Sequence, residues 1–159
     1  MSGISVVSGY RFAGFWWRVL AYIIDAFILT IVGAVVGGIL GFVIAGGGGS
    51  LDDVRGIVGI LSFVWYWLYF ALFESSSLRG TPGKRACGLI VTRDDGYRIS
   101  FGRATGRYFA QFLSALILCV GFLMAGWTRR KQALHDLICD TLVLKELDRQ
   151  ARITPPQVA

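Results

Sequence analysis

Long apolar stretches separated by short polar connections make up most of this chain. Three stretches stand out, running from Phe15 to about Ala45, from about Val54 to Phe73, and from Tyr108 to Trp127. About 20 apolar residues are enough for a helix to cross the roughly 30 Å hydrocarbon core of a bilayer. The pattern therefore predicts an all-α integral membrane protein, a small bundle of about three transmembrane helices. Because the first stretch would form a helix of roughly 46 Å, it must tilt, break near its glycines or continue beyond the membrane.

The polar connections predict the remaining organisation. Residues 88–101, GLIVTRDDGYRISF, place two β-prone runs around an Asp-Asp-Gly turn, which indicates a short cytoplasmic β-hairpin. We expect a flexible N-terminus over residues 1–9 and one membrane domain over 10–145. The tail from 146 to 159, with its two adjacent prolines, is expected to be disordered.

Composition supports a membrane protein, and it therefore changes how the net positive charge is interpreted. Hydrophobic residues make up 55% of the 159 residues, and the mean hydropathy is +0.61, too apolar for a soluble domain of this size. A net charge of +6 would suggest nucleic acid in a soluble protein. Here the lysines and arginines flank apolar stretches, where they set orientation. We therefore expect anionic lipid headgroups, and no nucleic acid, as partners.

The distribution of basic residues predicts the topology. Seven lie between the second and third stretches: Arg79, Lys84, Arg85, Arg93, Arg98, Arg103 and Arg107. The positive-inside rule puts this connection and the N-terminus of a multi-pass membrane protein in the cytoplasm. The basic residues 129–131, directly after the third stretch, also favour the cytoplasm. Three complete spans would put them outside, whereas a re-entrant third stretch would keep them inside; the sequence supports both.

An acidic residue inside the first stretch predicts a polar seam. Asp25 lies about ten residues past Phe15, roughly 15 Å deep and close to a bilayer midplane. A carboxylate there costs about 2.5 to 3.5 kcal/mol unless it faces protein or water. Arg18 and Tyr22 share its helix face at steps of four and three residues. We expect Arg18, Tyr22 and Asp25 to form a polar membrane seam in which Arg18 and Tyr22 are the nearest candidate partners of Asp25.

The same stretch carries small residues at every fourth position: Gly33, Gly37, Gly41 and Ala45. Such a ladder lets a second helix approach closely, either within the chain or in an oligomer.

The sequence RGTPGKR at residues 79–85 resembles a phosphate-binding loop but departs from it. Leu78 stands where that loop needs glycine, and Arg85 replaces the required serine or threonine. We therefore exclude nucleotide binding and expect Lys84 and Arg85 to face lipid headgroups.

His135 and Asp136 could suggest a metal-dependent hydrolase, but His135 is the only histidine and such sites need several ligands. We expect no metal, no cofactor and no enzyme activity. The alternative is structural: Asp136 neutralises Arg18, Arg103 or Arg107, because charges removed from water are normally paired. This predicts an interfacial charge cluster that contains Arg103, Arg107, His135 and Asp136.

These segments together resemble the RDD family of small bacterial membrane proteins. The similarity covers about residues 10 to 145 and lies in GFWWRVLAYIID at 14–25, TPGKRACGLIV at 81–91 and RRKQALHDLICDT at 129–141. It implies that Arg18, Asp25 and Asp136 are the arginine and two aspartates of the family name. It also implies one of two functions: a non-catalytic scaffold or accessory subunit of a larger membrane complex, or a small oligomeric cation/proton antiporter that uses Asp25.

Overall fold

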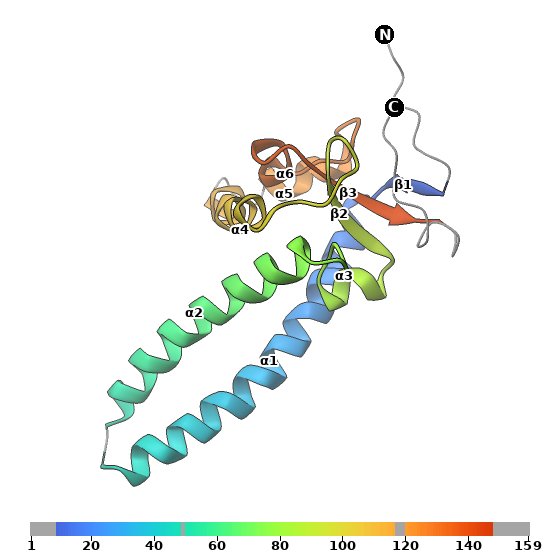
Figure 1. Ribbon diagram of the computed structural model, residues 1–159. Coiled ribbons are helices and arrows are strands. Elements are labelled where there is room, and N and C mark those ends of the chain that lie inside the picture. Colours follow the sequence, from blue (N-terminus) through green and yellow to red (C-terminus); the bar gives the residue numbers. More distant parts are fainter. Residues whose placement is uncertain (1–8, 49, 117–119, 148–159) are drawn as a thin grey trace.

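Two long antiparallel helices carry a compact head at one end. The computed structural model describes residues 9–48, 50–116 and 120–147. The long helices are α1 (Phe15–Gly46) and α2 (Leu51–Ser75), and they extend away from the head as a pair (Figure 1). Within the described chain, the segments Phe15–Gly46 and Arg55–Ser75 are long and apolar enough to cross a membrane.

A small antiparallel sheet forms part of the head. Its strands are β1 (Tyr10–Phe12), β2 (Leu89–Arg93) and β3 (Thr141–Glu146), in the order β1-β3-β2. In its core Val91 lies opposite Val143. Two short helices complete this part of the fold. Helix α3 (Pro82–Ala86) packs against α1, and α6 (Leu134–Ile138) lies near the C-terminal strand.

The predicted β-hairpin is wrong, although its turn forms. Arg93 N–H donates to the Tyr97 carbonyl at 2.8 Å across the Asp-Asp-Gly turn. The chain does not continue as a strand after it, and β2 pairs with β3 from the C-terminal part of the chain. Strand β3 is the better partner because its consecutive residues Leu142, Val143 and Leu144, which point to alternate faces of the sheet, are all buried.

The third apolar stretch does not form a membrane-spanning helix in the described residues. It is divided among α4 (Phe101–Leu116), α5 (Val120–Leu123) and a 3-10 turn, η1 (Met124–Gly126). Gly121 packs so tightly on Ser114 that an added Cβ would lie 2.9 Å from its Cα, so the chain folds back there. Figure 1 shows α4 almost end-on while α1 and α2 run lengthwise. The prediction of a three-span bundle is therefore not confirmed, because the described residues contain two candidate spans.

The core of the head lies between the sheet and the ends of α1, α2 and α4. Strand residues Leu89, Val91 and Val143 are buried against small residues of the helices, Ala21, Ala71 and Ala104. Small helix side chains let the sheet and α3 approach closely, which brings polar groups of different elements into contact.

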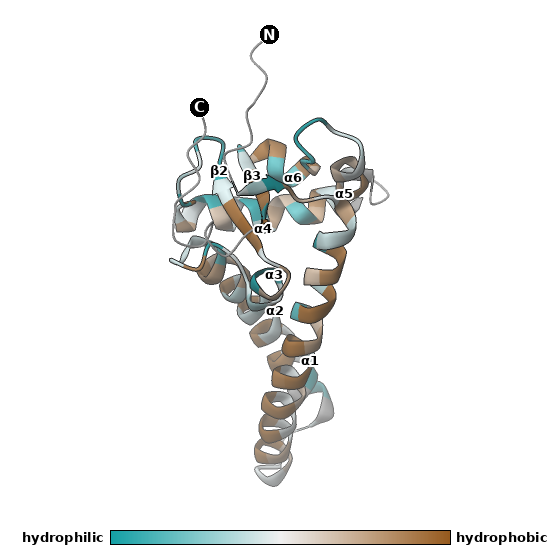
Figure 2. Cartoon of the chain, turned by 90° about the vertical axis from the view of Figure 1, so that its right-hand side faces the viewer, coloured by the Kyte–Doolittle hydropathy of each residue, from teal (hydrophilic) through white to brown (hydrophobic). Residues whose placement is uncertain are grey.

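The first long helix is continuous, and its first half lies in the head. Ala21, Asp25 and Leu29 are buried, whereas most residues after Leu29 are exposed and apolar, as the brown helix pair in Figure 2 shows. The exposed part, residues 30–46, is roughly 25 Å long. Of the small-residue ladder, Gly37 lies near Val58, at 3.8 Å from an added Cβ, while an added Cβ at Gly33 meets no described atom within 4 Å. The predicted flexible ends fall mainly on residues 1–8 and 148–159, outside the described residues.

Candidate functional site

Asp25 is fully buried between α1, α2 and α3, and three donors of the protein occupy its carboxylate. Oδ1 accepts hydrogen bonds from the Tyr69 hydroxyl at 2.8 Å and from Gly83 N–H at 2.7 Å. Oδ2 accepts one from the Thr81 hydroxyl. Both carboxylate oxygens are therefore used within the fold.

The segment that binds Asp25 is the first turn of α3. Thr81 is its N-cap and Pro82 occupies the first turn, where backbone N–H groups lack helical partners and attract anions. An added Cβ at Gly83 would lie 2.3 Å from the Ala21 carbonyl oxygen, so only glycine fits this contact. The turn that resembles a phosphate-binding loop thus binds an anion of its own chain.

Arg18 does not pair with Asp25, which corrects the predicted seam. Its guanidinium reaches into the head and donates to three groups: the Ala13 carbonyl (3.2 Å), the Lys131 carbonyl (2.6 Å) and the Asp136 carboxylate. Tyr22 is 62% exposed and belongs to no such cluster. The physical reason is direction: helical side chains tilt toward the helix N-terminus, which carries Arg18 into the head.

Asp136 is the centre of a buried charge cluster. It pairs with Arg18, and its Oδ1 lies 2.8 Å from Arg107 Nη2. Burial raises the pKa of Asp136, but the two guanidinium groups outweigh burial and hold it below its usual range. The structure thus has the expected pairing of Asp136 with Arg18 and Arg107. Arg103 instead donates to the Asp140 carbonyl at 3.4 Å.

Glu74, at the end of α2, belongs to the same cluster and was not predicted. It is 2% exposed, pairs with Lys84, and has its Oε2 3.5 Å from Arg107 Nε. Burial alone would lower the pKa of Arg107, but Asp136 and Glu74 raise it above its ordinary value. The signal in the sequence that could have indicated this role is the position of Glu74 directly after the second apolar stretch. The charge network therefore joins five elements through Arg18, Asp136, Arg107, Glu74 and Lys84.

The predicted lipid-headgroup role of Lys84 and Arg85 does not fit their positions. The Lys84 side chain is 11% exposed and pairs with Glu74. Arg85 Nη1 lies 2.7 Å from Oε1 of Glu146, the last residue of β3. Both cations thus stabilise the head from within.

His135 completes an arrangement with the residue types of a hydrolase triad. Its Nδ1 is 3.3 Å from the Ser114 hydroxyl, and its Nε2 is 3.4 Å from Asp136 Oδ1. Ser114 is fully buried, and its hydroxyl donates a hydrogen bond to the Ala110 carbonyl at 3.1 Å. Burial lowers the pKa of His135 to about 3, so the ring is neutral at physiological pH. Among the described residues, no group of three or more His, Cys, Asp or Glu could hold a metal ion.

Comparison with known proteins shows what the chain is similar to. The model described as the RDD family matches residues 12–140. An uncharacterized protein of Bacillus subtilis, YxaI, is 34% identical and covers 83% of this chain and 96% of its own. An uncharacterized protein of Haemophilus influenzae is 28% identical over 71% of this chain and 72% of its own. A proline-rich antigen of Mycobacterium leprae is 28% identical, over 55% of this chain and 38% of its own. No solved structure matches.

The chain belongs to the RDD family, as its three sequence motifs indicated. Arg18, Asp25 and Asp136 all lie in buried polar clusters, where they join the first long helix to the head.

Proposed function

We propose that this member of the RDD family is a non-catalytic membrane protein, a scaffold or accessory subunit of a larger membrane complex. One observation carries the proposal: at the head end of the helix pair, Arg18, Asp25 and Glu74 are all bound by groups of the head. The sequence has no charged residue from 30 to 46 or from 56 to 73. The parts of the two helices that extend away from the head therefore present no charged side chain to the membrane, as expected for an anchor.

The alternative of cation/proton antiport is not supported. A carrier site must exchange its ion or proton with water, whereas both oxygens of Asp25 accept hydrogen bonds from the protein. The Asp25 side chain is fully buried in contact with the head, although apolar residues on other faces of α1, such as Ile23 and Phe27, are exposed.

Two spans would remove the conflict between the basic segments. If α1 and α2 both cross, the N-terminus, the connection after α2 and the basic residues 129–131 share one side. The positive-inside rule assigns that side to the cytoplasm. The protein is then a multi-pass protein of the bacterial inner membrane with a cytoplasmic head.

The small-residue ladder supports contact with a further helix. Gly33 lies on the exposed part of α1, and an added Cβ there would meet no described atom within 4 Å. Small residues allow close backbone approach and stabilise helix pairs in lipid. The partner is either another membrane protein or a second copy of this chain.

A crosslinking experiment in native membranes tests the proposal. Gly33→Cys is placed in a chain whose own cysteines are replaced, and it is coupled to a thiol-reactive benzophenone. Ile39→Cys, about 120° around the helix from Gly33 and 60% exposed, is the matched control. We expect light to link Gly33→Cys to one discrete protein, and Ile39→Cys to give no such product. Equal or absent products at both positions would contradict a scaffold that uses this face.

A further inference from the structure

Helix α4 has its charged side chains inside and its apolar side chains outside. Arg107 is 1% exposed within the charge network, and Arg103 is half-buried. The large side chains that face outward are each 41–48% exposed: Phe101, Phe109, Phe112 and Leu113. A surface helix of a soluble protein has the opposite arrangement, with its apolar stripe against the core.

The outward side chains form one continuous arc. At 100° per residue they fall together with Gly102 and Gly106, and none of the described residues on this arc is charged. The arrangement follows from the charge network, because Arg107 turns toward Asp136 and Glu74 and the opposite face must then point away from the head.

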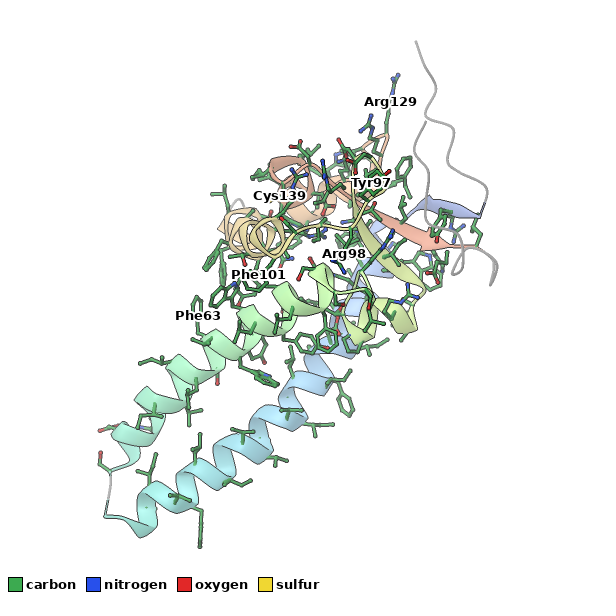
Figure 3. All side chains as sticks on the ribbon, viewed as in Figure 1. Phe63, Tyr97, Arg98, Phe101, Arg129 and Cys139 are labelled. Atoms are coloured by element: carbon green, nitrogen blue, oxygen red, sulfur yellow. The ribbon has the colours of Figure 1, made fainter. Side chains whose placement is uncertain are left out.

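This arc is continuous with the apolar surface of the candidate span α2. The Phe63 ring lies 6.4 Å from the Phe109 ring and 6.5 Å from the Phe112 ring, between centroids. Trp67 contacts Phe101 in the same way at 6.1 Å. Figure 3 shows Phe63 and Phe101 on the side of α4 from which the helix pair extends.

The orientation of α4 identifies what covers this face. Because α4 crosses the α1–α2 pair (Figure 1), it lies in the membrane plane when that pair runs along the bilayer normal. Its aromatic face then lies at the head end of the spans, at the depth where aromatic rings are enriched in membrane proteins. A helix with an apolar face of this kind can lie in the interface, inserted into the boundary between headgroups and acyl chains.

We propose that α4 is an interfacial helix whose Phe109, Phe112 and Leu113 face contacts bilayer lipid. The head is then held flat on the membrane surface by α4 and anchored in it by the helix pair. This inference depends on the membrane anchoring in the proposed function, and it replaces the third predicted span with a lipid-facing surface.

Fluorescence quenching in vesicles tests the inference. Phe112→Cys is made in the cysteine-free chain, coupled to an environment-sensitive fluorophore and reconstituted in phosphatidylcholine vesicles. The lipids are brominated either near the headgroup end or near the methyl end of their acyl chains. Two controls set the limits: Ile39→Cys on the exposed part of α1, and Tyr97→Cys, which is 71% exposed and lies away from the helix pair in Figure 3.

We expect shallow bromines to quench Phe112→Cys more than deep ones, deep bromines to quench Ile39→Cys more, and only aqueous iodide to quench Tyr97→Cys. Leu113→Cys should repeat the result for Phe112→Cys if that variant fails to fold. Quenching of Phe112→Cys by iodide alone, or by neither quencher, would overturn the inference in favour of water or a protein partner. If Ile39→Cys also escapes bromine, the membrane anchoring itself is wrong.

Discussion

At the residue scale, each buried aspartate is compensated by groups from several elements of the fold. The apolar stretch around Asp25 predicts that its carboxylate must be compensated. Helical spacing then suggested Arg18 for Asp25, but the donors are Tyr69, Thr81 and Gly83 from distant segments. Spacing along one helix cannot reveal contacts that form only when three elements meet. The role of Glu74 in the charge network was not predicted for the same reason, since its partners lie on α3 and α4.

The neutral state of His135 predicts a loss of stability in acid. Its pKa falls from the ordinary 6.5 to about 3 on burial, so its contribution is complete above pH 6.5 and is lost as pH falls toward 3. Between pH 7.5 and 5 the free energy of unfolding should fall by about 2 kcal/mol through this group. Denaturant unfolding in detergent measures it, with His135→Gln as the control whose decline should be smaller by this amount. Equal declines would mean that His135 is not buried as a neutral ring.

At the element scale, the sequence predicted elements better than their pairing. The β-prone run at residues 89–93 forms a strand, and the glycine-containing turn after it forms as well. Its partner β3 comes from near the C-terminus, and local pattern carries no information on that pairing. The run from Tyr108 to Trp127 is apolar on average, but α4 also holds Arg107, which pairs with two buried acids. Average hydropathy therefore could not distinguish a span from a helix that lies across the others.

The contact between α3 and α1 predicts a sharp difference between two glycine substitutions. Gly83→Ala would place a methyl group 2.3 Å from the Ala21 carbonyl oxygen and 2.7 Å from the Asp25 carboxyl carbon. Overpacking of this kind costs about 1 to 3 kcal/mol or more, and it should also weaken the Asp25 hydrogen bonds. Gly102→Ala, in α4, meets no described atom and should raise helix stability by up to about 1 kcal/mol.

Thermal unfolding in detergent compares the two glycine variants with the parent chain. Gly83→Ala should lower the melting temperature, and Gly102→Ala should leave it unchanged or raise it. If Gly83→Ala were as stable as the parent chain, the close contact of α3 with α1 would be wrong.

At the scale of the whole molecule, composition correctly indicated a membrane protein but not the number of candidate spans. The described chain has an apolar pair of helices and a head (Figure 2). Buried ion pairs join these two parts. The sequence left two topologies open because both flanks of the third stretch are basic. If the third stretch folds back within the head and does not cross, as we propose, both basic flanks lie on the same side of the membrane.

The side of the membrane on which Trp127 lies tests this two-span account most directly. Trp127 is the last residue of the third apolar stretch and is 67% exposed. Trp127→Cys, Tyr97→Cys and Asp52→Cys are compared in the cysteine-free chain with a membrane-impermeant maleimide, in intact and in permeabilised cells. We expect Asp52→Cys to react in intact cells, and Tyr97→Cys and Trp127→Cys to react only after permeabilisation. Reaction of Trp127→Cys in intact cells, together with Asp52→Cys, would mean that the third stretch crosses the membrane and would contradict the account.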